Sequence, residues 1–200
     1  MKAGLRMPRK GFFPEFLIAI LLAVILIPVY FILPSRMMAS EILIMAIPTL
    51  AFILLLGYTG LLNFSMGSLF AVGAYTAGIL LARHHAHILL AITAGVVTSG
   101  IISIIVGYFC IKRGGLIFAL LTLAFNQLIW FIIWQWKSFT GGPDGIWGIK
   151  REALNLGIIA INLKPTFNFY IFVLIFFILI FLFLRRLIES PFGKVLMGMR

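Results

Sequence analysis

The apolar positions of this chain form long runs that contain no Asp, Glu, Lys or Arg. Five runs are marked by this lack of charge: Phe16–Leu33, Ile42–Leu56, Ile88–Ile111, Gly114–Trp136 and Phe167–Leu184. A helix needs about 20 apolar residues to cross the hydrocarbon layer, within a range of about 17–25. Strands of a membrane barrel alternate apolar with polar residues over short segments. Because these runs do not alternate, they predict transmembrane helices.

A sixth span is expected in the uncharged but glycine-rich stretch GYTGLLNFSMGSLFAVGAYTAG, residues 57–78. In a helix over Asn63–Ala82, several small residues would lie on one stripe, which Gly60 continues before the helix. The stripe consists of Gly60, Asn63, Gly67, Ala71, Ala74 and Gly78. Such a stripe lets a second helix approach closely. We expect a break at residues 57–62, because unwound backbone near a span end, here Gly57, Gly60 and Asn63, is tolerated only against protein or water. The stripe therefore predicts a packing seam, part of which borders a translocation path.

Two other spans carry similar faces. The fourth has Gly95, Ser99, Ser103 and Gly107, and the fifth has Gly115, Ala119, Thr122 and Asn126, all at helical spacing. Three helices with small or mildly polar faces indicate a bundle that encloses something. The predicted fold class is thus an all-α integral membrane protein, a polytopic bundle of about six transmembrane helices.

Composition and charge support this class and set the topology. Residues are 63% hydrophobic and 10% charged, and the mean hydropathy is +1.19, which a soluble domain could not hide from water. With a cytoplasmic N-terminal tail at residues 1–15, six spans return the C-terminus to the cytoplasm and place ten of the 16 basic residues inside. The net charge of +11 therefore indicates topology, not nucleic-acid binding. No small-residue cleavage site follows Leu33, so the first span is expected to remain as an anchor.

The expected spans contain no Asp, Glu or His side chain. All five acids are expected at span ends or in loops: Glu15, Glu41, Asp144, Glu152 and Glu189. This lowers the case for ion-driven transport, and no acid–base pair indicates an enzyme. Gly193-Lys194 lacks the earlier glycine and the following hydroxyl of a phosphate loop. We predict no bound cofactor and no metal. A metal site at the three histidines, residues 84, 85 and 87, is the alternative. Cys110 is the single cysteine, so no disulfide is expected within the chain.

Two segments outside the spans stand out. The loop at residues 137–165 contains TGGPDG, a strong turn signal. At the C-terminal end, Pro191 opens a short amphipathic helix with Phe192, Val195, Leu196 and Met199 on one side. That helix is either interfacial on the cytoplasmic leaflet or a docking helix for a cytoplasmic protein.

Four stretches together carry a family resemblance. They are GYTGLLNFSMGSLFAVGAY at 57–75, LTLAFNQ at 121–127, TGGPDGI at 140–146 and SPFGKVLMGMR at 190–200. In this order and with these gaps, the chain resembles the permease subunit of bacterial branched-chain amino-acid ABC importers, the LivM type. It departs in having Ser65-Met66-Gly67 where many relatives carry Gly-His-Gly. Family members also continue beyond the position of Arg200, so we expect a fragment or a truncated product.

The resemblance implies a role within a larger machine in the bacterial inner membrane. Its partners would be a second permease, two cytoplasmic ATP-binding subunits that hydrolyse ATP, and a periplasmic substrate-binding protein. Residues 16–184 would form the permease domain, and residues 185–200 would lead into the coupling loop. The residues implied are, for the periplasmic loop, Thr140, Gly141, Gly142, Asp144 and Gly145, and for ATPase coupling, Ser190, Pro191, Phe192, Gly193 and Arg200. A urea or short-chain amide importer is the alternative within the class; an ATP-independent channel or carrier is the alternative outside it.

Overall fold

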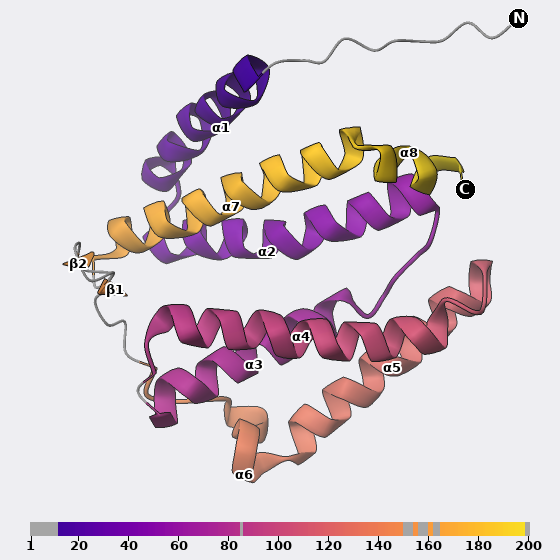
Figure 1. Ribbon diagram of the computed structural model, residues 1–200. Helices are drawn as coiled ribbons and strands as arrows, with labels where there is room; N and C mark the ends of the chain where they lie inside the picture. The colour runs from indigo at the N-terminus through magenta and orange to yellow at the C-terminus, as the bar shows by residue number, and fades with distance from the viewer. Residues whose placement is uncertain (1–11, 85, 150–153, 156–159, 162–164, 199–200) are drawn as a thin grey trace, which may run out of the picture.

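The protein is a bundle of long helices, seen in a computed structural model that describes residues 12–84, 86–149, 154–155, 160–161 and 165–198 (Figure 1). The elements in chain order are α1 (Phe12–Ile32), α2 (Arg36–Leu54), the π-helix η1 (Leu55–Thr59), α3 (Met66–His84), α4 (Ile88–Cys110), α5 (Gly115–Gln135), α6 (Lys137–Thr140), the 3-10 turn η2 (Gly142–Asp144), β1 (Leu154–Asn155), β2 (Ala160–Ile161), α7 (Thr166–Glu189) and α8 (Pro191–Gly198). The predicted fold class is confirmed.

Five described helices are long and apolar enough to cross a membrane: Arg36–Thr59, Met66–His84, Ile88–Cys110, Gly115–Gln135 and Thr166–Glu189. The span expected at Phe16–Leu33 coincides with α1, of which Leu17–Ile32 is a shorter apolar helix. Many large apolar side chains point outward, for example Ile104 at 73% exposure and Leu116 at 75%. Side chains of this kind on the outside of a helix bundle suit contact with lipid.

Two expected boundaries are wrong. The second span begins at Arg36 and not at Ile42, so Glu41 lies on the exposed side of α2 instead of at its end. The chain remains helical through η1, and the break falls on residues 60–65, later than the expected 57–62. The reason lies in the backbone: Gly60 has φ +71°, a left-handed conformation that suits glycine and ends the helix there.

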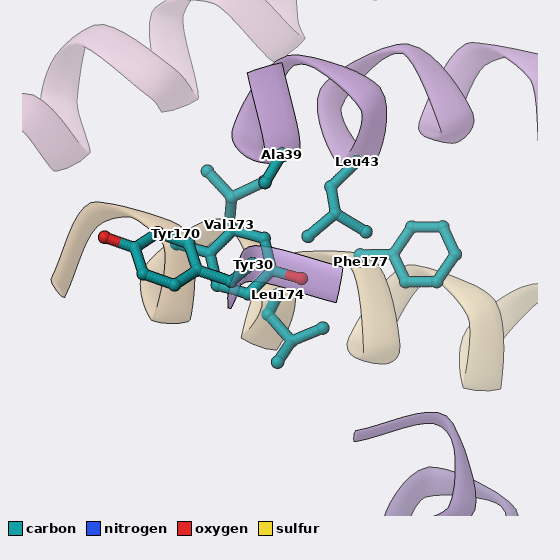
Figure 2. Close-up of a cluster of buried hydrophobic side chains, with 7 residues drawn as sticks. All are labelled: Tyr30, Ala39, Leu43, Tyr170, Val173, Leu174 and Phe177. Carbon is teal, nitrogen blue, oxygen red and sulfur yellow. The ribbon is translucent and has the colours of Figure 1, made fainter. Parts of the chain in front are cut away.

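Large side chains hold α1, α2 and α7 together. Figure 1 shows α2 and α7 side by side and running in the same direction, with α1 crossing them at one end. The buried cluster between them consists of Tyr30, Ala39, Leu43, Tyr170, Val173, Leu174 and Phe177 (Figure 2). The Tyr170 hydroxyl donates a 2.6 Å hydrogen bond to the carbonyl oxygen of Leu26, tying α7 to α1. We call α1, α2, α7 and α8 the large-residue group.

The helices α3, α4, α5 and α6 form a second group. Helices α3 and α4 pack along most of their length, and α5 lies obliquely against both (Figure 1). A smaller buried cluster, made by Val106, Cys110, Phe118 and Ile129, joins α4 to α5. We call this the small-residue group, because glycine, alanine and serine dominate the α3–α4 contact described below. Direct contacts between α2 and α3 are sparse compared with those of the two main pairs, α2 with α7 and α3 with α4.

The segment between α5 and α7 is the least regular part of the described chain. It contains α6, η2 and the two-residue strands β1 and β2, which pair antiparallel with Leu154 opposite Ile161. The expected loop at 137–165 thus includes short ordered elements. Figure 1 places β1 and β2 beside the start of α7, at the end of the bundle opposite α8.

Candidate functional site

A cavity of about 640 Å³ that is open to the outside lies between the two groups of helices, and several of its lining residues, such as Val96, are exposed. The large-residue group contributes Ile47, Pro48 and Ala51 from α2 and Ile180 and Leu184 from α7. The small-residue group contributes six residues from α3 and six from α4, namely Met66, Leu69, Phe70, Gly73, Ala74, Ala77, Ile92, Gly95, Val96, Ser99, Gly100 and Ser103. The side chains of the described lining are apolar apart from two serine hydroxyls. Its volume falls within the range of about 300–1,000 Å³ usual for small-molecule sites.

The floor of this cavity is set by the close approach of α3 and α4 at two glycines. A Cβ atom placed on Gly95 would lie 2.7 Å from the carbonyl oxygen of Gly73, and one on Gly73 would lie 3.2 Å from the carbonyl oxygen of Gly95. Distances this short to backbone atoms leave no room for a side chain without separating the helices. Ala77 extends the same face by one turn, with its Cβ 3.6 Å from the Cβ position of Gly95. The two backbones therefore touch directly.

Hydroxyl groups hold the same two helices in register. Ser99 Oγ donates a 2.9 Å hydrogen bond to the carbonyl oxygen of Leu69 across the α3–α4 contact. Thr98, the residue before Ser99 on α4, donates its hydroxyl to Thr76 Oγ1 of α3 at 3.0 Å. Between transmembrane helices such bonds add to packing, each by about 0.6 kcal/mol on average. The α3–α4 pair is thus joined by both close backbone contact and polar bonds.

The segment that leads from α2 into α3 is tied to α5. The Asn63 carboxamide oxygen accepts hydrogen bonds from the backbone N–H (2.9 Å) and the hydroxyl (2.6 Å) of Ser65, which is fully buried. The backbone N–H of Phe64 donates to Thr122 Oγ1 of α5 at 3.1 Å. The Thr122 hydroxyl in turn donates to the Ala119 carbonyl oxygen at 2.9 Å. The backbone N–H groups of Phe64 and Ser65 in this link are therefore satisfied by protein side chains.

The TGGPDG turn is a compact structure built on three glycines. Gly141, Gly142 and Gly145 have φ angles of +82°, +60° and +69°, which side chains rarely allow. The Thr140 hydroxyl donates to the carbonyl oxygen of Ile133 at 2.6 Å and accepts from the Gly142 N–H at 3.1 Å. A Cβ on Gly141 would overlap the carbonyl of Gly145. The predicted turn is confirmed at these residues.

The segment after this turn folds back on α3. A Cβ at the buried Gly78 would lie 3.2 Å from Ile146 Cδ1 and 3.5 Å from Ile149 Cδ1. At the end of α3, the Arg83 guanidinium donates to the carbonyl oxygens of Ser138 and Phe139 at 2.9 and 3.0 Å. These contacts fix α6 and the turn to one end of the small-residue group.

At the other end of the bundle, the predicted C-terminal helix is present as α8. Its apolar face is divided: Gly193 is buried and Leu196 is partly buried, while Phe192 and Val195 are 56% and 61% exposed. The expected single apolar side therefore splits into an inner and an outer face. Met199 and Arg200 lie outside the described residues.

The expected seam is not one continuous helical stripe, because α3 begins only at Met66. Gly57 lies in η1, Gly60 ends it, and Asn63 caps the link. Of the remaining small residues, Gly67 faces Asn126 of α5, with 4.0 Å between its Cβ position and the carboxamide oxygen, and Gly78 faces the loop. Ala71 is partly buried, and Ala74 alone among the stripe residues lines the cavity. Thr122 lies beside the link and Asn126 beside Gly67, and neither lines the cavity.

The small-residue face expected on the fourth span agrees with the cavity lining better than the stripe expected on α3, and one cavity residue of α3 was not predicted. Gly95, Ser99 and Ser103 all line the cavity, whereas the surroundings of Gly107 are open. Gly73, which makes the closest contact with α4, was not on the expected stripe. The available signal was its spacing of four residues from both Leu69 and Ala77, the same step that joins Gly95 to Ser99. Among the described residues, no three His, Cys, Asp or Glu side chains gather as a metal site would require; His85 lies outside them.

Comparison with known proteins identifies the family. Residues 32–200 match the family described as branched-chain amino acid transport system / permease component. The chain is also 26% identical over 139 residues to the high-affinity branched-chain amino acid transport system permease protein LivM of Salmonella typhimurium. That alignment covers 70% of this chain and 33% of the relative, so the chain spans about a third of the length of this curated protein. No solved structure matches. Because the family match extends over most of its length, the chain belongs to the permease family of branched-chain amino acid transport systems.

Proposed function

We propose that this chain is the membrane-spanning permease subunit of an ATP-driven importer for leucine, isoleucine and valine, and forms the translocation path with a second permease. The observation that carries this proposal is the apolar cavity between α2, α3, α4 and α7. A branched aliphatic side chain gains about 1.5–3 kcal/mol when it leaves water for such surroundings. Family membership supports the same substrate class.

The lining favours a branched-chain amino acid over urea or a short-chain amide. The aliphatic side chain of a branched-chain amino acid gains from this apolar wall, and urea has no such part; the charged ends of the amino acid and the polar groups of urea both lack partners in it. In the described lining only Ser99 and Ser103 carry polar side chains, and the Ser99 hydroxyl already donates to Leu69. The absence of fixed charge there also means that the ammonium and carboxylate of a substrate are not held tightly. We therefore assign substrate selection largely to a periplasmic binding protein.

Energy would come from two cytoplasmic ATP-binding subunits that dock on α8. Ser190 and Pro191 begin this helix, and its outer face exposes Phe192 and Val195 to a partner. Residues expected on the cytoplasmic side include Lys112, Arg113, Arg185, Arg186 and Lys194, which agrees with a bacterial inner-membrane protein whose N-terminus is cytoplasmic. The TGGPDG turn, at the opposite end of the bundle, would then face the periplasm.

Reconstitution tests the proposal. Proteoliposomes that hold the permease pair and the ATP-binding subunits, supplied with the binding protein, should accumulate radiolabelled leucine only when ATP is present on the subunit side. Unlabelled isoleucine and valine should compete, and urea should not. Competition by urea would support the amide importer instead. Uptake by the chain alone without ATP would support a channel or carrier and contradict the proposal.

A matched pair of variants tests the cavity itself. Gly100 and Gly107 lie on α4, and a Cβ at either position meets nothing within 4 Å, but only Gly100 lines the cavity. Gly100→Phe should reduce leucine uptake at least tenfold because the ring occupies the path, while Gly107→Phe should change it less than twofold. Equal effects of the two variants would show that the cavity is not the path.

A further inference from the structure

A groove of about 310 Å³ lies between α2 and α7, where these two helices end side by side (Figure 1). One wall is α2 with η1 and the other is α7, and the described lining includes no residue of α1 or α3. The groove is open to the outside, since Ile53 on one wall is 57% exposed and the Glu189 side chain on the other is 50% exposed. We call this space between residues 50–58 and 181–189 the lateral groove.

The lateral groove and the cavity described above lie on different sides of α2. Pro48 and Ala51 line the cavity, whereas Leu50 and Ile53 line the lateral groove. A step of two residues turns an α-helix by about 200°, so these two pairs point to opposite sides of α2. The cavity side is the one that α3 and α4 face. The lateral groove therefore opens away from the small-residue group and is a feature of the outer surface of the bundle.

The lining of the lateral groove changes from apolar to polar along the two helices. Leu50 and Phe181, which lie deepest in the membrane spans, are apolar. The three polar residues of the described lining, Tyr58, Arg185 and Glu189, lie at the ends of these spans: Tyr58 is the second-last residue of one and Glu189 the last residue of the other. The ends of spans lie at the level of the lipid headgroups. An amphiphile that lies parallel to the helices, with its polar end at the rim, therefore fits the lateral groove.

The apolar part of the lateral groove explains the fit of an acyl chain but not the choice of a lipid. An acyl chain that fills the space makes dispersion contacts that an empty groove would lose. Lipid tails are as apolar as leucine, so a chain that moves into the groove from the surrounding bilayer gains little hydrophobic free energy. Selection among lipids must come from the rim.

The rim presents both signs of charge next to each other. Arg185 Nε donates to Glu189 Oε1 at 3.2 Å, and these side chains are 24% and 50% exposed. This bond uses one of the five guanidinium N–H donors and one of the two carboxylate oxygens. The remaining donors suit a phosphate oxygen, and the remaining carboxylate oxygen suits an ammonium group. Arg186, the neighbouring base, does not line the groove. The charged pair of the rim therefore complements a headgroup that carries a phosphate and an ammonium.

We infer that the lateral groove is a binding site for phosphatidylethanolamine, whose headgroup carries a phosphate and a primary ammonium. One acyl chain lies along Leu50, Ile53 and Phe181. The Arg185 guanidinium donates to the phosphate, and the ammonium donates to the Glu189 carboxylate. The inference goes beyond the proposed transport function and does not depend on it, because it concerns the outer surface of the bundle and not the cavity.

Lipid titration of the purified chain in detergent, followed by native mass spectrometry, tests the inference. Phosphatidylethanolamine, phosphatidylcholine and phosphatidylglycerol with identical acyl chains are the three probes. Phosphatidylcholine has the same charges as phosphatidylethanolamine but no N–H donor, and phosphatidylglycerol has no ammonium. Phosphatidylethanolamine should bind with a Kd at least fivefold lower than either of the others. Equal Kd values, or a lower Kd for phosphatidylglycerol, would overturn the inference.

Variants of the rim assign the two charges. Glu189→Gln should reduce the preference for phosphatidylethanolamine over phosphatidylcholine to less than twofold, and Arg185→Gln should weaken the binding of all three lipids at least fivefold. Arg186→Gln is the matched control, since it removes a neighbouring charge outside the groove, and it should leave every Kd within twofold. A preference that persists in Glu189→Gln, or an equal effect of Arg186→Gln and Arg185→Gln, would overturn the inference.

Photocrosslinking in the membrane of intact cells tests the occupant without purification. A benzoylphenylalanine residue replaces Ile53 in the groove or, as the control, Ile104, which is 73% exposed on α4. The share of phosphatidylethanolamine among the lipid adducts at position 53 should be at least threefold higher than at position 104. Equal shares would mean that surrounding lipid fills the groove without selection. An adduct at position 53 with a protein would mean that another helix covers the groove. Either result would overturn the inference.

Discussion

The two groups of helices illustrate two opposite ways of joining transmembrane segments. In the large-residue group, Tyr30, Tyr170 and Phe177 fill the space between α1, α2 and α7, so the helices stay apart and side chains make the contact. In the small-residue group, Gly73 and Gly95 bring the backbones of α3 and α4 together, and hydroxyls add bonds across the contact. Truncating a side chain in a contact of the first kind leaves a void, whereas adding an atom to a contact of the second kind forces the helices apart.

The largest effect is expected when the close contact is forced open. Gly95→Leu places a side chain where even a Cβ lies 2.7 Å from a backbone oxygen, so α3 and α4 must separate, at a cost of about 3 kcal/mol. The free energy of unfolding in mixed detergent micelles measures this. Gly100→Leu, on the same helix but facing open space, is the control and should unfold like the unmodified chain.

Removing a large side chain from the other group should cost less. Tyr170→Ala leaves a void among Tyr30, Val173 and Leu174 and removes the bond to Leu26. We expect a loss of about 2 kcal/mol, below the value for a water-soluble core because lipid replaces water as the reference surroundings. The same unfolding titration applies. Tyr170→Phe separates the hydroxyl from the ring, and a full loss in that variant would show that the bond, not the packing, joins α7 to α1.

The link between the groups should be intermediate in sensitivity. Thr122→Val keeps the shape of the side chain but removes the acceptor of the Phe64 N–H, which costs about 1 kcal/mol. Faster hydrogen exchange at Phe64 in a detergent-solubilised sample would locate the effect. Thr93→Val on α4, an exposed threonine that bonds only within its own helix, should leave exchange at Phe64 unchanged.

The smallest effect is expected for a single hydroxyl at the close contact. Ser99→Ala removes the bond to Leu69 while the glycine contact remains, so the free energy of unfolding should fall by about 0.6 kcal/mol. A loss as large as that of Gly95→Leu would reverse the comparison, because hydroxyls and not backbone proximity would then hold α3 to α4.

The sequence could predict the membrane class and most helices because charge-free runs of span length have one structural solution in lipid. It could also predict the α8 start at Pro191 and the turn at Gly141–Gly145, where proline and glycine have specific backbone roles. The cavity face of α4 was predictable for a related reason: Gly95, Ser99 and Ser103 repeat at helical spacing.

What could not be predicted depends on which helices become neighbours. Small residues occur on more than one face of α3, and spacing alone does not say whether Gly67 or Gly73 meets α4. The start of α3 was set by the cap between Asn63 and Ser65, and the extent of α2 by the π-helical segment. At each of these two places a local hydrogen-bond pattern replaces the expected α-helical turn. The pattern at Asn63 and Ser65 lies next to a tertiary contact, the hydrogen bond from Phe64 to Thr122.

The uncharged lining of the cavity has a consequence for acid–base behaviour. Throughout its described walls there is no side chain that gains or loses a proton between mild acid and mild base. If the proposed path runs here, this wall carries the same charge at pH 6 and at pH 8. Any acidity dependence of uptake in intact cells would then originate outside this wall.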